Sequence, residues 1–223
     1  TLAIIGATGS GKTTLAGLIP RFYDATQGAV LVDGVNVRDY TFDALYDRLG
    51  YVTQKAVLFS GTVQDNIFFG QSEAADTDET LQQALQLSQA AEFVDRYPEK
   101  AAHPIAQLGR NVSGGQKQRL SIARALARRP EILIFDDSFS ALDYKTDATL
   151  REGLAKQLPG TTKIIVAQRI STIRHADQIL VLDRGEIAGL GTHDALMASC
   201  PVYREIAMSQ LSEEELKKGG ASK

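Results

Sequence analysis

The sequence predicts an α/β fold with a mostly parallel sheet, a small antiparallel β portion and an inserted segment of helices. Apolar runs occur within the predicted strands at residues 2–5, 131–137 and 161–167, as expected of strands buried on both faces of a parallel sheet. Short β pieces within residues 28–37 are joined by an Asp-Gly turn, which indicates a hairpin. From Gly61 to about Pro130 the pattern changes to helix.

A phosphate-binding loop lies near the start of the chain. Gly6-Ala7-Thr8-Gly9-Ser10-Gly11-Lys12-Thr13 fits the pattern GxxxxGK[ST], between an apolar strand and a helical pattern that continues to Pro20. The glycines let backbone N–H groups converge on phosphate oxygens, and the helix N-terminus adds its positive dipole end. Lys12 adds a point charge, and the Thr13 hydroxyl can ligate Mg²⁺. A chance glycine turn before Lys-Thr is the alternative, and the flanking strand and helix favour nucleotide binding.

The composition argues against several other classes. The chain has 223 residues, a formal net charge of −3 and a pI near 5.7, so it carries no electrostatic footprint for nucleic acid or anionic lipid. The single Cys200 excludes an internal disulfide. No run approaches the length of a membrane span, and the apolar start lacks the basic region of a signal peptide. We expect a soluble chain or the soluble piece of something larger, and a start inside a strand favours the second.

Polar residues follow three predicted strands. The strand at residues 50–53 ends at Gln54, the strand at 131–137 ends in Asp136 and Asp137, and the strand at 161–167 ends at Gln168. Ligands of open α/β sheets bind at the carboxyl ends of the strands. In a chain with a phosphate loop, the two aspartates are therefore the expected Mg²⁺ partner and water-activating position.

A second anion-binding device is indicated by Val112-Ser113-Gly114-Gly115-Gln116, which precedes a helical run from Lys117 to Arg129 that Pro130 stops. A hydroxyl, flexible backbone amides and a helix dipole are brought together there. An ordinary capping box, with Ser113 as the N-cap and Gln116 three residues later, is the alternative and is favoured by the residues alone.

The remaining segments complete the expected fold. Helices are predicted at residues 78–94, 145–158 and 194–211, and residues 177–183 and 186–190 read as a hairpin around Arg184-Gly185. Residues 211–223 are expected to fray. The three histidines, His103, His175 and His193, lack metal-ligand spacing and are interpreted as structural, and Cys200 has no base nearby in sequence.

With these pieces in order, residues 1–210 resemble the nucleotide-binding domain of an ATP-binding cassette (ABC) transporter. Gly6 to Thr13 matches the family's Walker A, Gln54 its Q-loop, residues 112–116 its signature LSGGQ with Val for Leu, and residues 132–136 its Walker B. Ser140-Ala141-Leu142-Asp143 matches the D-loop, and residues 166–170 align with the H-loop. The resemblance implies a P-loop NTPase (RecA-like) core at residues 1–53 and 130–199, with a helical subdomain at 54–129.

The resemblance also implies an ATP site with Mg²⁺. The residues that would contact ATP are Gly6, Thr8, Gly9, Ser10, Gly11, Lys12, Thr13, Thr14, Gln54, Ser113, Gly114, Gly115, Gln116 and Asp143. Thr13, Gln54 and Asp136 would arrange the Mg²⁺, and Asp137 and Gln168 would be the catalytic positions.

Partners follow from the same resemblance. In the family two such domains close head to tail, so Ser113 and Gly115 would serve the ATP of a partner domain, while Gln54 and its neighbours would meet the coupling helices of transmembrane domains. Residues 58–67 and 189–193 resemble exporter members, which implies a place at the cytoplasmic face of a cell membrane. The family's adenine-stacking aromatic lies upstream of Walker A, so this chain would be a piece of a longer transporter subunit.

Two positions depart from the family pattern. Members that hydrolyse ATP well have Glu where this chain has Asp137, and His where it has Gln168. In addition, Gln107 stands where exporters commonly have Glu. Our hypothesis is a heterodimeric exporter in which this chain's Walker side forms a degenerate site and its signature completes the partner's competent site.

Three alternatives stay open. Asp137 can still serve as a base in a fully active homodimeric exporter, because carboxylates of either length act as bases. The chain can instead be a regulatory ATP-binding clamp without significant turnover. A soluble cassette ATPase of DNA repair or translation is disfavoured by the absence of a basic surface.

Overall fold

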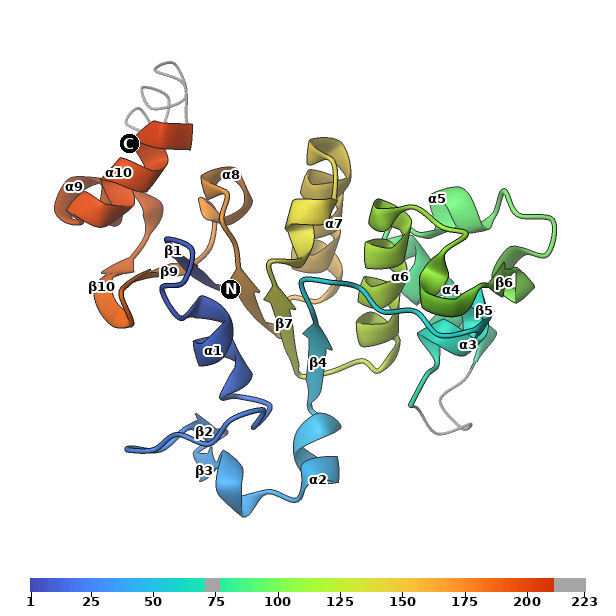
Figure 1. Cartoon of the computed structure of the whole chain (residues 1–223), viewed down its shortest axis with the longest axis horizontal. Helices are drawn as coiled ribbons and strands as arrows, with labels where there is room; N and C mark the ends of the chain where they lie inside the picture. The colour runs from blue at the N-terminus through green and yellow to red at the C-terminus, as the bar shows by residue number, and fades with distance from the viewer. Residues whose placement is uncertain (71–76, 211–223) are drawn as a thin grey trace. The chain divides into compact units, whose positions relative to one another are not determined.

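The computed structural model describes residues 1–70 and 77–210, in two compact units. One unit contains Thr1–Leu45 together with the chain from Thr162 onward, and the other contains Tyr46–Thr161. Figure 1 labels their helices and strands. The tail predicted at residues 211–223 lies outside the described residues.

Four strands of the first unit lie in the order β10-β9-β1-β8. Strand β1 (Leu2–Gly6) lies between β9 (Gln178–Asp183) and β8 (Thr162–Val166) and is parallel to both, whereas β10 (Glu186–Gly191) pairs antiparallel with β9. Ala3, Ile4 and Ile5 are all buried, which explains why β1 is a continuous apolar run rather than an alternating one. The predicted parallel strands and the predicted C-terminal hairpin are confirmed.

Short elements follow β1 in the first unit. Helix α1 (Lys12–Gly17) ends before Pro20, where the sequence predicted its end. Strands β2 (Leu31–Val32) and β3 (Val35–Asn36) form the predicted hairpin. Their turn residues Asp33 and Gly34 have φ angles of 50° and 79°. A two-residue type I′ hairpin turn requires such positive φ angles at both positions. A 3₁₀ turn η1 (Val37–Asp39) and helix α2 (Phe42–Tyr46) come next.

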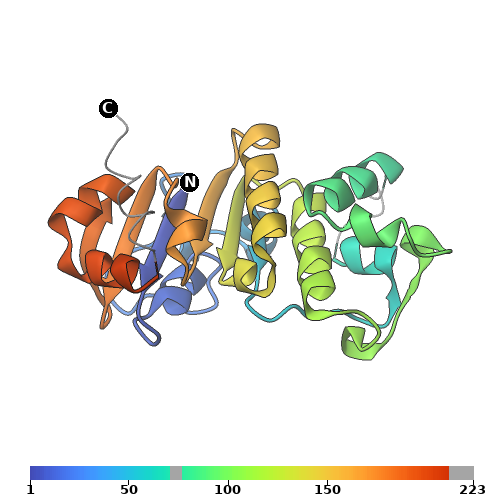
Figure 2. The same cartoon turned by 90° about the horizontal axis from the view of Figure 1, so that it is seen from above.

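Three helices complete the first unit: α8 (Ile170–Ile173), α9 (His193–Ser199) and α10 (Pro201–Gln210). Figure 2 shows α9 and α10 packed together beside β10. The prediction that residues 194–211 are helical is confirmed as far as Gln210, but in two helices, because the chain is extended at Cys200, with φ −110° and ψ 104°. A proline disfavours helical geometry in the residue before it and lacks an N–H, so Pro201 begins a new helix.

The second unit contains the parallel pair β4 (Leu49–Val52) and β7 (Ile132–Asp136), in register from Leu49 opposite Ile132 to Val52 opposite Phe135. The side chains in the middle of β7 are fully buried, as the apolar run predicted. A 3₁₀ turn η5 (Ser138–Ala141) leads from β7 into helix α7 (Tyr144–Gln157).

Helix α6 (Gly114–Ala127) organises the rest of this unit. It packs against β4, α3 (Val63–Ile67) and α4 (Asp78–Leu87), as Figure 1 shows in green and cyan. The other short elements are α5 (Ala91–Val94), the antiparallel pair β5 (Gly61–Thr62) and β6 (Pro104–Ile105), and the 3₁₀ turns η3 (Lys100–Ala102) and η4 (Gln107–Gly109).

The prediction of one helix over residues 78–94 is wrong, because the helix breaks between α4 and α5. Gln89 has a φ of 60°, outside the helical region. The Ser88 hydroxyl donates to Leu85 O at 3.2 Å and accepts from the Ala90 N–H at 3.3 Å. A serine side chain that bonds nearby backbone groups competes with the helical ladder, and this competition explains the break.

Arg124 ties α6 to the chain that follows Gln54. Its guanidinium donates to Val57 O at 3.0 Å and to Asn66 O at 2.7 Å. It also lies over the rings of Phe59 and Phe69, which stack on each other with centroids 4.2 Å apart. Both rings are partly exposed, so this stack is a surface feature that contacts the half-buried guanidinium of Arg124.

Candidate nucleotide-binding site

The predicted phosphate loop connects β1 to α1 in the first unit. Gly6 closes β1 so tightly against β9 that a Cβ there would lie 2.1 Å from Leu182 O and 2.6 Å from Ser10 Oγ. The turn between β9 and β10 supports the loop from the same side, because the Gly185 N–H donates to Ser10 O at 3.1 Å. The fold therefore specifies the course of the loop.

The Lys12 side chain is held at the loop by backbone carbonyl oxygens of the loop. Its Nζ donates to Gly6 O and Ala7 O, each at 2.8 Å, and lies 3.5 Å from Ser10 Oγ. Thr13 and Thr14 are exposed on the first turn of α1, and Gly11 precedes that turn with a φ of 97°. An ammonium, a helix N-terminus and two hydroxyls thus share one short segment, which suits a phosphate group and Mg²⁺.

Gln168 lies beside this loop in the same unit. It follows β8, whose Val166 is in register with Ile4 of β1, and the Ala167 N–H donates to Ile4 O at 3.1 Å. Two residues beyond this register point, β1 ends at Gly6 and β8 leads to Gln168. The carboxyl ends of adjacent parallel strands thus bring Gln168 next to the phosphate loop.

The carboxylate pair lies in the second unit, at the end of β7. Gln54 Nε2 donates to Asp137 Oδ2 at 2.8 Å, so the structure brings these two predicted residues together. The Tyr51 hydroxyl donates to Asp136 Oδ2 at 3.1 Å, a contact that the sequence reasoning did not find. Both carboxylates are buried, and Asp137 has the left-handed backbone geometry of φ 48° and ψ 25°. Aspartate is one of the non-glycine residues that adopt this geometry more readily, so the turn after β7 is accommodated by the residue itself.

Helix α6 also contacts the segment that leads to Gln54. The buried Gln118 donates from Nε2 to Thr53 O at 3.1 Å, one residue before Gln54. The helix that begins at the predicted signature therefore fixes the backbone next to the predicted Q-loop residue.

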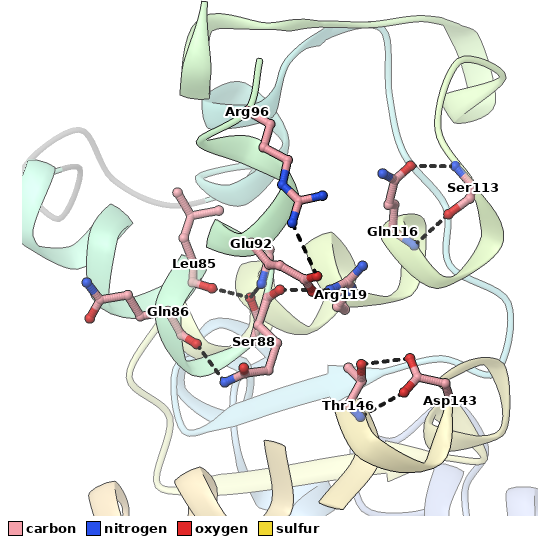
Figure 3. A network of polar contacts seen from close by, with 12 residues as sticks. Leu85, Gln86, Ser88, Glu92, Arg96, Ser113, Gln116, Arg119, Asp143 and Thr146 are labelled. Carbon is pink, nitrogen blue, oxygen red and sulfur yellow. Dashed lines mark hydrogen bonds and ion pairs between the residues drawn. The ribbon is translucent and has the colours of Figure 1, made fainter. Parts of the chain in front are cut away.

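The signature stretch begins α6 with a complete capping box. The Ser113 Oγ accepts from the Gln116 N–H at 3.3 Å, and Gln116 Oε1 accepts from the Ser113 N–H at 2.8 Å, as Figure 3 shows. The capping interpretation is confirmed. A Cβ built on Gly114 would meet no atom within 4 Å, and one on Gly115 would lie 3.5 Å from Ala141 O. The packing of the described residues therefore gives no reason for a glycine at position 114.

Asp143 caps α7 in the same unit. Its carboxylate accepts from the Thr146 N–H at 3.0 Å and from the Thr146 hydroxyl at 2.7 Å (Figure 3). The hydrogen bonds from the Thr146 N–H and hydroxyl lower the pKa of Asp143. This predicted D-loop residue is fully exposed and is engaged within its own helix.

The histidines and the cysteine make structural contacts. His103 stacks on Tyr97 with ring centroids 3.8 Å apart, and His193 Nδ1 lies 2.8 Å from the Tyr203 hydroxyl. Cys200 is buried. Within residues 1–70 and 77–210, no cluster of three or more His, Cys, Asp or Glu side chains is placed to hold a metal ion. The predicted Mg²⁺ ligands Thr13, Gln54 and Asp136 instead supply hydroxyl, amide and carboxylate oxygens, which are the hard donors that Mg²⁺ prefers.

None of the described helices is both long enough and apolar enough to cross a bilayer.

A strand, a glycine loop and a helix that holds its lysine, with carboxylates ending a second parallel strand, define a nucleotide-binding domain of the P-loop class. The family model for ABC transporters matches residues 1–140. The chain belongs to the ABC transporter family and is its ATP-binding domain.

Relatives agree with this assignment. An uncharacterized ABC transporter ATP-binding protein of Mycobacterium tuberculosis is 49% identical over 211 residues, covering 94% of this chain and 36% of the relative. An ATP-dependent lipid A-core flippase of Syntrophus aciditrophicus is 40% identical over 215 residues, covering 96% of this chain and 35% of the flippase. This chain thus spans about a third of the length of these relatives.

A solved structure is similar throughout. The structure of a bacterial Atm1-family ABC exporter with ATP bound matches with a TM-score of 0.90 and 37% identity, over 95% of this chain and 37% of the exporter chain. The mixed α/β fold with its mostly parallel sheet is therefore that of an exporter's nucleotide-binding domain.

Proposed function

We propose that this chain is the ATPase domain of an exporter whose own phosphate loop holds ATP and hydrolyses it slowly. The observation that carries the proposal is Asp137, which directly follows Asp136 at the end of β7 and is bonded to Gln54 at 2.8 Å. Its carboxylate is one methylene shorter than the Glu of the family pattern. A setback of about 1 Å from the attacking water can lower the rate on the order of 10²-fold.

Each residue has a role in this proposal. Lys12 and the loop amides hold the phosphates, Asp137 orients the attacking water and takes its proton, and Gln168 donates a hydrogen bond near the terminal phosphate. Thr13, Gln54 and Asp136 would hold Mg²⁺, which would supply neutralisation of charge on the phosphate oxygens. Unlike histidine, Gln168 carries no proton charge, which weakens the site further.

The proposed partner is a second nucleotide-binding domain of a non-identical subunit. Gly114 supports this part, because the chain's own packing gives no reason for a glycine there, whereas the close approach of a partner's ATP would. Transmembrane domains would bind near Gln54, at the cytoplasmic face of a membrane. Relatives named as a lipid A-core flippase and a putative multidrug export protein support the exporter assignment.

We also propose the family's subdomain arrangement for this chain, with a RecA-like core at residues 1–53 and 130–199 and a helical subdomain at 54–129. The helices gathered around α6 support the second part.

A fully active homodimeric exporter is the second candidate. It is favoured by the same contact, because a buried Asp137 held by Gln54 is already oriented as a base. A regulatory clamp without turnover is the limiting case of the first proposal, with ATP retention but no measurable hydrolysis.

The deciding experiment restores the family residues. In the full-length protein, with any non-identical partner disabled by a Lys-to-Ala change in its own phosphate loop, Asp137→Glu combined with Gln168→His should raise ATP turnover on the order of 10²-fold if these two positions limit the rate. Lys12→Ala should abolish Mg-ATP retention in equilibrium dialysis. Turnover that stays unchanged in the double variant would favour the homodimer.

A matched control makes the same chemical changes away from the site. Asp95 and Gln82 are exposed on the helices of the second unit, so Asp95→Glu with Gln82→His should leave turnover unaltered. An equal rise in this control would show that the effect is nonspecific.

A further inference from the structure

Gln210, the last residue of α10, contacts the loop that carries Gln168 at two points. Its side-chain Nε2 donates to Gln168 O at 2.7 Å, and its Oε1 accepts from the Ile170 N–H at 2.9 Å. One planar amide thus bonds to the loop backbone at both ends, at Gln168 and at Ile170, where α8 begins. Ile170 lies 40 residues before Gln210 in the chain.

Gln210 supports the backbone between Ala167 and α8, where, among the described residues, neither sheet hydrogen bonds nor a side-chain cap at Arg169 supports it. The sheet holds the loop as far as Ala167, whose N–H bonds to Ile4 O, and α8 begins three residues later. The N-cap residue Arg169 makes no side-chain capping bond to α8. The first-turn N–H of Ile170 is one of the groups that a helix leaves without an internal partner, and Gln210 supplies its acceptor.

The helix that bears Gln210 is firmly placed. Tyr203 and Ala207 of α10 are fully buried, and the Tyr203 hydroxyl bonds to His193 of α9. The two hydrogen bonds of Gln210 therefore link an anchored helix to the backbone at Gln168 and Ile170.

We infer that Gln210 is a positioning residue that sets where the Gln168 side chain stands beside the phosphate loop. The inference rests on the proposed function, because it takes Gln168 as the group that meets the terminal phosphate. Since misplacement of a group near the reacting atoms by about 1 Å costs on the order of 10²-fold, releasing the backbone at Gln168 is expected to lower kcat about tenfold.

Two variants separate the two hydrogen bonds. Gln210→Ala removes both, whereas Gln210→Glu keeps the acceptor for Ile170 and places a carboxylate against Gln168 O. Ser209→Ala is the matched control, because the Ser209 hydroxyl donates to Ile206 O within α10 itself.

Turnover is measured in the full-length protein, with any non-identical partner disabled by a Lys-to-Ala change in its own phosphate loop. We expect Gln210→Ala to lower kcat about tenfold with the KM for ATP within twofold, and to speed hydrogen exchange at the Ile170 amide. In Gln210→Glu the Ile170 amide should stay protected while turnover at pH 7.5 falls. Unchanged kcat in Gln210→Ala, an equal loss in Ser209→Ala, or wild-type turnover in Gln210→Glu overturns the inference.

Failure of the proposed function looks different. If Gln168→Ala leaves kcat unchanged while Gln210→Ala still speeds exchange at Ile170, the clamp stands as a structural contact, and both the role of Gln168 and the positioning role of Gln210 are rejected.

Discussion

Gln54 Nε2 lies 2.8 Å from Asp137 Oδ2, across two segments that are 83 residues apart in sequence. A hydrogen bond to a charged group contributes about 1.5–3 kcal/mol, and this bond joins the exposed Gln54 to the buried Asp137. The end of β7 and the chain after β4 are therefore energetically coupled at the site where hydrolysis is proposed to occur.

The first prediction concerns this coupling. Gln54→Leu should lower the free energy of unfolding by about 1.5–3 kcal/mol in urea denaturation, because Asp137 loses a charge-assisted hydrogen bond. In the Asp137→Asn background the same change should cost less, since the bond is no longer charge-assisted. Additive effects in this double-mutant cycle would contradict the coupling. Gln82→Leu, on the exposed face of α4, is the matched control.

Local patterns were enough to predict several parts of this site. The phosphate loop between a strand and a helix, the aspartates that end β7 and the cap at Ser113 all depend on residues within a few positions of one another. The Tyr51–Asp136 contact depends on the register between β4 and β7, which local sequence does not contain. The Gln210 contact could not be predicted either, because Gln210 bonds to backbone groups, which carry no sequence signal.

Helix boundaries show the same limit. The apolar stripe of residues 78–94 continues across Ser88, yet the helix breaks there. The break at Cys200 agrees with the proline that follows it, because a proline disfavours helical geometry in the residue before it. At Ser88 the break depends on a side-chain hydrogen bond and a left-handed Gln89, which the helical stripe did not predict.

The second prediction concerns the close approach of β1 and β9. In Gly6→Ala the new methyl group would lie 2.1 Å from the backbone oxygen of Leu182, which a side-chain rotation cannot relieve. We expect a loss of about 1–3 kcal/mol in the free energy of unfolding and weaker Mg-ATP retention, because the phosphate loop must shift. Chemical denaturation and equilibrium dialysis measure the two effects. Gly28→Ala is an unsuitable control because its φ is 76°, whereas Gly160→Ala meets no neighbouring atom and should change neither quantity.

The third prediction concerns pH. Burial lowers the pKa of His193 below its ordinary value near 6.5, so the unfolded chain binds a proton more readily than the folded one. The contribution of neutral His193 is therefore fully present above about pH 6.5 and is lost as the pH falls toward the lowered pKa of the folded state. Urea midpoints between pH 7.5 and 5 should fall on acidification, with a slope from this group of at most about 1.4 kcal/mol per pH unit.

The matched variants for this prediction are His193→Gln and His103→Gln. The first should flatten the acid slope, because glutamine does not titrate. The second removes the contact between His103 Nδ1 and Glu99 Oε2, which are 3.0 Å apart on another surface, and should leave the contribution of His193 intact. An unchanged slope in His193→Gln would assign the acid sensitivity to other groups.

The fourth prediction separates what the chain needs for itself from what it offers a partner. A methyl group at Gly114 meets no atom within 4 Å, and the position begins α6, where alanine is preferred over glycine by up to about 1 kcal/mol. Gly114→Ala should therefore leave the free energy of unfolding unchanged or raised. ATP turnover of the assembled protein should nevertheless fall, because a partner's nucleotide would approach this backbone. Wild-type turnover in Gly114→Ala would show that the signature stretch does not contact a partner's nucleotide. Gly6→Ala is the contrasting variant, because it disturbs the chain's own packing and should lose both stability and turnover.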